Sequence, residues 1–111
     1  MLTEFELKSE VKNSCLVIKT VGYINNVGGE KIANEYDKFA SEVKKVVLDL
    51  EETKVVNSIG ISFLIEIIEK LNDKDGKLIF TNLDSSIEKT FTIMGLFQFA
   101  EKADSVDSAV A

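Results

Sequence analysis

The sequence predicts one α/β domain with a mostly parallel sheet of four to five strands and about four helices. Length and composition indicate a globular chain, with 111 residues of which 45% are hydrophobic. Short β-branched, apolar segments alternate along the chain with segments of helical periodicity. This alternation favours parallel strands joined by right-handed helical crossovers. We expect residues 1–111 to form a single domain, without repeats or linkers.

Two strands are predicted at the start of the chain. Phe5 and Leu7 alternate with charged residues, which is typical of a half-exposed strand. Lys12-Asn13 then predicts a turn, and the apolar segment 15–21 predicts a second strand. Because the turn between them is short, we expect the two strands to pair in antiparallel fashion.

A helix and a third strand are predicted next. Apolar residues recur at helical spacing over residues 30–43, and the pair Gly28-Gly29 is predicted to break the chain before that helix. Residues 44–50 contain the apolar run VVLDL. Such a run is typical of a strand that is buried on both faces.

The pattern then predicts a helix over residues 58–73 and a strand over residues 77–81, with Asp75-Gly76 ending the helix. The helix carries an apolar stripe that we expect to face the core, formed by Ile61, Leu64, Ile65, Ile68 and Leu71.

Two more helices and an edge strand are predicted at the end of the chain. The segment SSIE at residues 85–88 resembles a capping arrangement and predicts a helix that ends at Gly95. Residues 97–103 predict a short edge strand. Asp104 is predicted to cap a last, short helix.

Charge and composition exclude several classes of function. A net charge of −6 argues against binding nucleic acid or an anionic membrane, since both require clustered Lys and Arg side chains. The chain contains no histidine, which excludes histidine-based catalysis and histidine metal sites. Cys15 is the only cysteine, and no segment has the pattern of a signal peptide or a membrane span. We expect a cytoplasmic protein that uses no metal and no cofactor.

Ser58 lies where the loop after the third predicted strand meets the helix over residues 58–73. A serine there either caps the first N–H groups of the helix or carries a phosphate beside the positive end of the helix dipole. Gly60 would allow close approach by another molecule. Ile59 and Phe63 fall on the face of the helix opposite the apolar stripe. That placement is typical of a docking surface, although a neighbouring loop would equally cover them.

Asp49 raises a competing hypothesis, because receiver domains accept phosphate on an Asp at the end of a parallel strand. That chemistry needs an acidic pair at the end of an earlier strand to hold a divalent cation. Neither earlier strand supplies one, so the sequence favours a loop-positioning or hydrogen-bonding role for Asp49. Phosphate-loop and nucleophile-elbow motifs are also missing. The sequence therefore favours a binding module, or a substrate of another enzyme, over an enzyme.

Three segments are shared with a known family: GYIN at residues 22–25, VVLDLEETKVVNSIGISFLI at residues 46–65, and GLFQFAEKADSVDSAV at residues 95–110. With them the chain resembles the STAS domains, and more narrowly the bacterial anti-sigma-factor antagonists. In that family a strand ending in Asp-Leu is followed by Asp-Ser-Ser-Gly or Asp-Ser-x-Gly at the start of a helix. Residues 57–60 of this chain read Asn-Ser-Ile-Gly at that place.

The resemblance implies that Ser58 is a phosphoacceptor and that the partner is an anti-sigma factor with GHKL-type serine kinase activity. The unphosphorylated protein would bind this partner, and phosphorylation would break the complex. We expect a monomer or a weak dimer. The residues that the resemblance and the helix pattern assign to partner binding are Asn25, Asn57, Ser58, Ile59, Gly60, Ser62 and Phe63.

Asn57 and Asn25 stand where the family commonly has Asp. Because Asn cannot act as a base, phosphorylation would then depend on groups of the kinase. The same departures leave a second hypothesis open, in which the chain is a STAS scaffold or an accessory subunit of a lipid or anion transport complex and is never phosphorylated. A third, a small-ligand or nucleotide-binding domain, rests on α/β analogy alone. Ser62, one turn after Ser58, is either a second acceptor or a solvated residue.

Overall fold

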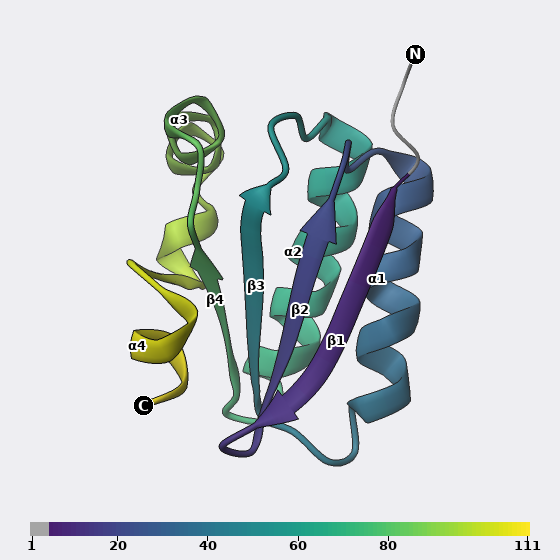
Figure 1. The fold of residues 1–111 in the computed structure, drawn as a ribbon, viewed down its shortest axis with the longest axis vertical. Helices are drawn as coiled ribbons and strands as arrows, with labels where there is room; N and C mark the ends of the chain where they lie inside the picture. The colour runs from purple at the N-terminus through teal and green to yellow at the C-terminus, as the bar shows by residue number, and fades with distance from the viewer. Residues whose placement is uncertain (1–4) are drawn as a thin grey trace.

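The computed structural model describes residues 5–111 as a sheet of five strands with four α-helices and one short 3-10 helix (Figure 1). The predicted α/β class and the predicted order of elements are confirmed. The bounds are β1 Glu6–Lys12, β2 Cys15–Val21, α1 Asn26–Phe39, β3 Lys45–Glu52, α2 Ser58–Asn72, β4 Lys77–Thr81, α3 Ser85–Ile93, the 3-10 helix η1 Leu96–Gln98, β5 Glu101–Ala103 and α4 Val106–Val110.

The strands lie in the order β1-β2-β3-β4-β5. Only the β1–β2 pair is antiparallel, and the other three pairs are parallel, as the alternation of strands and helices predicts. The central strand β3 is buried on both faces: Val46 and Leu48 face the main core and Val47 faces a second, smaller one. Its continuous apolar run is therefore explained by cover from two sides.

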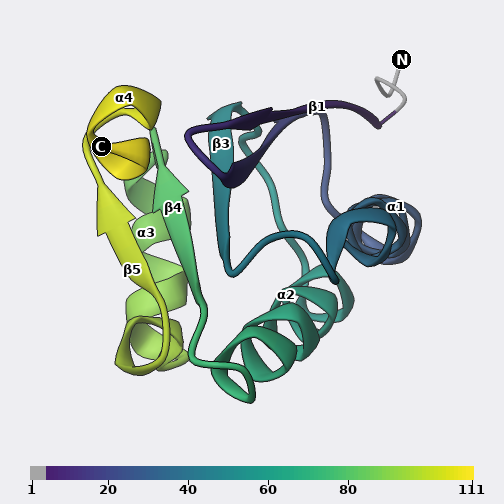
Figure 2. The ribbon, with the colours of Figure 1, turned by 90° about the horizontal axis from the view of Figure 1, so that it is seen from below.

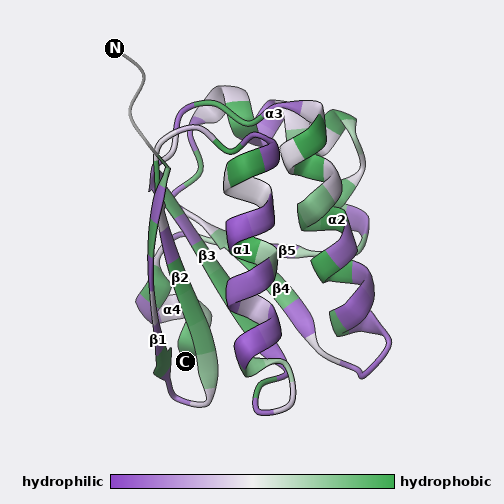
Figure 3. Cartoon of the chain, turned by 90° about the vertical axis from the view of Figure 1, so that its right-hand side faces the viewer, coloured by the Kyte–Doolittle hydropathy of each residue, from purple (hydrophilic) through white to green (hydrophobic). Residues whose placement is uncertain are grey.

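The sheet separates two cores of unequal size. The helices α1, α2 and α3 contribute to the main core on one face, while α4 contributes to the smaller core on the other (Figure 2). In the hydropathy colouring, hydrophilic and hydrophobic bands alternate along α1, as expected of a helix with one face on the core, while β2 beside it is largely hydrophobic (Figure 3). Within residues 5–111, no helix combines the length and the hydropathy needed to cross a bilayer.

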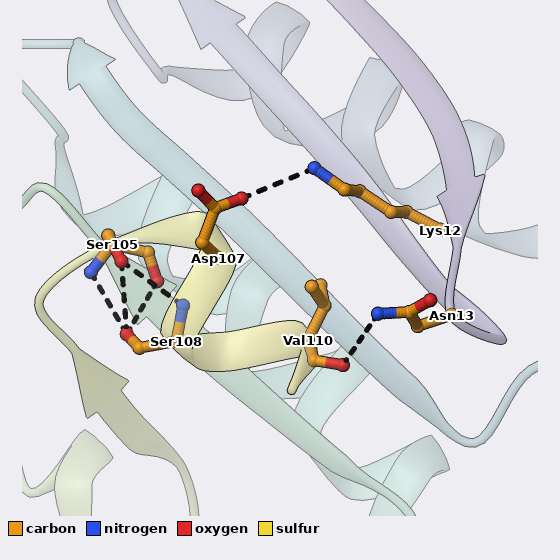
Figure 4. A network of polar contacts seen from close by, with 6 residues as sticks. All are labelled: Lys12, Asn13, Ser105, Asp107, Ser108 and Val110. Atoms are coloured by element: carbon orange, nitrogen blue, oxygen red, sulfur yellow. Dashed lines mark hydrogen bonds and ion pairs between the residues drawn. The ribbon is translucent and has the colours of Figure 1, made fainter.

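Helix α4 is fastened to the β1–β2 turn by polar contacts (Figure 4). The Lys12 ammonium lies 3.3 Å from Asp107 Oδ1, and Asn13 Nδ2 donates to the carbonyl oxygen of Val110 at 3.3 Å. Asp104 is not the cap that the sequence predicts, because Ser105 takes that place and forms a reciprocal capping box with Ser108. These contacts hold Ala109 and Val110 over the smaller core.

Helix α1 begins at Asn26 and ends at Phe39, so the predicted range of 30–43 is wrong at both ends. Gly28 and Gly29 do not break the chain; they are buried inside the first turns of the helix. Both positions face aromatic rings. A Cβ atom on Gly28 would lie 2.8 Å from Phe5 Cδ1, and one on Gly29 would lie 2.6 Å from Phe63 Cδ2. The glycines are therefore explained by close packing rather than by a turn.

Three smaller predictions also change. Helix α3 is capped by Asp84 and not by the serine pair that follows it: the Asp84 carboxylate accepts a hydrogen bond from Ser86 N at 3.2 Å. Hydrogen bonds from the side chain and backbone of Ser86 lower the pKa of the Asp84 carboxyl. The predicted edge strand 97–103 divides into η1 and the three-residue β5. In α2, Ile67 is fully buried while Ile65 is half-buried, so the core stripe is wider than predicted.

Replacing Ser9 with alanine is expected to raise the pKa of the Glu35 carboxyl. The Ser9 hydroxyl on β1 donates a hydrogen bond to Glu35 on α1, and this bond is the main cause that lowers the Glu35 pKa; partial burial opposes it and Lys38 adds to it. A lowered pKa in the folded state stabilises the protein above the unfolded-state pKa, and the effect is lost as pH falls through the folded-state pKa. The difference in unfolding free energy between Ser9→Ala and wild type should thus shrink in acid.

Carbon-detected NMR titration of the Glu35 carboxyl measures this pKa directly. Lys38→Ala provides the matched comparison and should also raise the Glu35 pKa, because Lys38 contributes both a hydrogen bond and a positive charge that lower it. An unchanged Glu35 pKa in Ser9→Ala would show that the hydroxyl does not stabilise the carboxylate.

Candidate functional site

The start of helix α2 is capped by Asn57, not by Ser58. Asn57 has an extended backbone, and its Oδ1 atom accepts a hydrogen bond from Gly60 N at 2.8 Å. Ser58 is the first residue of the helix and is exposed. Its hydroxyl makes no hydrogen bond to any protein group in residues 5–111. Of the two interpretations that the sequence allows, capping is therefore excluded for Ser58.

Asn25 has the same role at the start of helix α1. Its Oδ1 atom accepts hydrogen bonds from Val27 N at 3.0 Å and from Gly28 N at 3.1 Å. Asn and Asp are about equally good caps. Asparagine at positions 25 and 57 therefore caps the two helices as aspartate would, but without the two negative charges that aspartate would add. Within the described part of the chain, the side chains of Asn25 and Asn57 form no hydrogen bond with Ser58.

The two helix starts are held together by the backbone of Ile24. Ile24 forms an isolated parallel bridge with Val56; its N–H donates to the carbonyl of Val55 at 3.0 Å and its carbonyl accepts from Asn57 N at 3.1 Å. Gly60 lies against this segment so closely that a Cβ atom there would be 2.3 Å from the Ile24 carbonyl oxygen. Gly60 is thus a packing residue that allows α2 to start beside α1.

Three exposed apolar side chains lie on the segments that Ile24 joins. Val27 in the first turn of α1, Val55 in the loop before α2 and Ile59 in the first turn of α2 are each about half exposed, at 51%, 51% and 52%. We call these three residues the apolar rim. Ile59 was singled out from the sequence, but Val27 and Val55 were missed, since they lie outside any periodic apolar pattern. Their one sequence signal is a β-branched apolar residue two positions from a capping asparagine.

Phe63 does not share the exposure of Ile59. It is half-buried and packs on α1 where Gly29 leaves room for its ring, at 2.6 Å from the Gly29 Cβ position. The expected exposure of Phe63 is therefore only partial, and its role in partner binding stays a prediction. Helical spacing places Ile59 and Phe63 on one face of α2 without indicating that α1 covers part of that face.

Ser62 is exposed, but its hydroxyl is engaged. Ser62 Oγ donates to the carbonyl of Ile59 at 2.6 Å, the back-bond that serines in helices commonly form. Ser58 has no such bond. The two serines on this turn of α2 are therefore distinguished by the freedom of their hydroxyl groups.

The electrostatic surroundings of Ser58 favour an added negative charge on the helix itself. Neither α1 nor α2 carries an acidic residue in its first turn. Because the Ile24–Val56 bridge joins the segments that precede the two helices, their partly positive N-terminal ends lie near each other. The chain contains no histidine, and Asn57, the residue before Ser58, cannot act as a base. Ser58 thus presents an exposed hydroxyl without a hydrogen bond in residues 5–111, at a helix end where an added negative charge would be tolerated.

Asp49 is a structural residue, as the sequence favours. It is buried, and its Oδ1 atom accepts from Glu51 N at 3.1 Å and from Asn82 Nδ2 at 2.9 Å. It thereby ties the end of β3 to Asn82, the residue that follows β4. In the described residues, no group of three or more His, Cys, Asp and Glu side chains is arranged to hold a metal ion.

The STAS domain family model matches residues 6–109. The fold is similar to that of a Bacillus cell fate determinant, SpoIIAA, solved in its phosphorylated form (TM-score 0.73, 21% identity, 96% of each chain covered). It is also similar to an anti-sigma factor antagonist from Mycobacterium paratuberculosis (TM-score 0.82, 18% identity, 96% of this chain and 92% of that one). A third similar structure is the S58E variant of RsbS from Moorella thermoacetica (TM-score 0.78, 18% identity, 94% and 91%).

Proposed function

The chain belongs to the STAS domain family, and from this premise we propose that it is an anti-sigma-factor antagonist that phosphorylation of Ser58 switches off. The partner is an anti-sigma factor that is also a serine kinase. The observation that carries the proposal is the state of Ser58, an exposed hydroxyl at a helix start that is free because Asn57 caps the helix. The similar structures support it, since they include an antagonist in a phosphorylated form.

Docking in this proposal uses the apolar rim. Val27, Val55 and Ile59 lie on the segments around Ser58, so a partner that covers them also covers the hydroxyl. The backbone contacts of Ile24 hold the rim in place before binding, which reduces the ordering cost of association. The unphosphorylated protein is therefore the binding form.

Phosphorylation acts at the interface and leaves the helix intact. A phosphate adds roughly −1.5 to −2 charges at neutral pH. At the first residue of α2 this charge meets the positive end of the helix dipole, which stabilises it. In the complex the same charge lies among apolar side chains and loses its hydration, which costs far more than the dipole returns. The complex therefore dissociates while the domain stays folded.

Phosphoryl transfer requires groups that this chain lacks. Ser58 Oγ attacks the γ-phosphorus of ATP; the bond to Oγ forms, the bond to the bridging oxygen of ADP breaks, and the hydroxyl proton passes to a base. With Asn57 and Asn25 in place of carboxylates, the kinase supplies that base and the Mg²⁺ site. Asn57 contributes by holding the helix start, and with it Ser58, in position.

Incubation with the anti-sigma kinase and MgATP, followed by intact mass measurement and phosphosite mapping, tests the proposal. We expect one phosphate for each chain, on Ser58, and none on Ser58→Ala. Ser62→Ala is the matched control and should accept the phosphate as wild type does, since its hydroxyl is already bonded to Ile59. A stable complex with the kinase and no phosphate on Ser58 would contradict the switch and favour the scaffold hypothesis.

A further inference from the structure

A second apolar surface lies along the C-terminal half of α2. Ile65 and Ile68 of α2 face Met94, Leu96 and Phe99 across a groove of about 460 Å³. Phe99 is 64% exposed and Met94 is 48% exposed, which is unusual for side chains of this size next to one another. We call this surface the α2–η1 groove.

The α2–η1 groove is separate from the Ser58 site. Its residues on α2 begin two turns after Ser58, and a rise of about 1.5 Å per residue places Glu69 roughly 16 Å further along the helix axis. Its other wall comes from the end of α3 and from η1, which contribute nothing to the apolar rim. The proposed switch therefore does not account for this surface.

The polar residues that line the groove are acidic or neutral. Glu69 and Asp73 line it, and neither forms an ion pair within residues 5–111. The nearest lysine along α2, Lys70, is engaged on the side of α1, where its ammonium lies 3.4 Å from Asp37 and 3.6 Å from Glu66. No lysine lines the groove. An apolar floor with unneutralised carboxylates at its edge is complementary to an apolar ligand that carries positive charges.

We propose that the α2–η1 groove binds a basic amphipathic helix of a partner protein. Apolar side chains at helical spacing on the partner pack between Ile65, Met94 and Phe99, and its lysine or arginine side chains pair with Glu69 and Asp73. A second copy of this chain is disfavoured, because the two acidic edges would repel in a protein with a net charge of −6. An anionic membrane is disfavoured for the same reason.

A labelled peptide of about 15 residues, built from leucine and lysine at amphipathic helical spacing, is the probe. Its binding is measured by fluorescence anisotropy on the intact chain. The variant Glu69→Lys/Asp73→Lys reverses the charge of the groove. The matched control Glu10→Lys/Glu30→Lys makes the same change in net charge at two exposed residues that lie outside the groove. Phe99→Ser removes the most exposed apolar side chain of the groove.

We expect the groove reversal to weaken binding about tenfold or more, Phe99→Ser to weaken it severalfold, and the control pair to change it less than about threefold. Amide shifts in NMR spectra should change at Ile65, Ile68 and Leu96. Ser58→Glu should bind the peptide as wild type does, so this proposal stands or falls independently of the phosphorylation switch. Equal weakening by the control pair, or shift changes centred on the apolar rim, would overturn it.

Discussion

Replacing Ser58 with glutamate is expected to weaken the complex with the anti-sigma kinase about 100-fold, while Ser58→Ala binds as tightly as wild type. The carboxylate would be enclosed by the apolar rim and its partner without a cation to pair with. An uncompensated charge in an interface costs about 3 kcal/mol, and each 1.4 kcal/mol corresponds to about a factor of ten in affinity. Alanine leaves the surface neutral, and it loses no hydrogen bond, since the Ser58 hydroxyl makes none within residues 5–111.

Titration calorimetry with a kinase that lacks ATP separates binding from phosphoryl transfer. Ser85→Glu is the matched control, because Ser85 is the exposed first residue of α3, and Asp84 caps that helix as Asn57 caps α2. It adds the same charge at an equivalent helix position outside the apolar rim and should change the affinity little. Neither glutamate should lower the melting temperature, since a carboxylate in the first turn of a helix is stabilising. Equal losses in both variants would show that net charge, not the position of Ser58, governs binding.

The alternation of elements could be predicted from the sequence because it depends on local pattern. The run VVLDL of β3 and the repeat of apolar residues in α2 are complete within one segment, and both elements are found where the pattern predicts them. The start of α1 could not be predicted in this way. Gly28 and Gly29 are poor helix formers, so local propensity places the break there. Tertiary packing decides otherwise, since Phe5 and Phe63, both distant in sequence, need the space that a missing Cβ leaves.

The position of the candidate site could be predicted from the sequence, but the full set of residues that form it could not. Ser58 and Ile59 were identified because they start a recognisable helix. The apolar rim also contains Val27 and Val55, which join them only through the bridge between Ile24 and Val56. A contact between two loops leaves no periodic signal in either segment. The role of Asn57 as cap was equally hidden, since Asn and Ser are both good capping residues and their order alone does not choose between them.

Replacing Gly60 with alanine is expected to lower the free energy of unfolding by about 2 to 3 kcal/mol, which corresponds to roughly 10 °C or more in melting temperature. Propensity alone predicts the opposite sign, because alanine is favoured over glycine in a helix by about 1 kcal/mol. The clash reverses the sign: a Cβ atom at Gly60 would lie 2.3 Å from the carbonyl oxygen of Ile24, and a backbone group that is bonded to Asn57 N cannot move without losing that bond.

Thermal and denaturant unfolding of Gly60→Ala measure this effect, and Gly29→Ala is the matched control. The Cβ position at Gly29 meets side-chain atoms of Phe63, with Cδ2 at 2.6 Å and Cβ at 3.0 Å, and no hydrogen-bonded backbone group, so its loss of stability should be smaller. A melting temperature of Gly60→Ala equal to or above that of wild type would show that the two helix starts are not in close contact. The backbone of Ile24 would then not hold the apolar rim in place, and the preorganised docking surface around Ser58 would lose its structural basis.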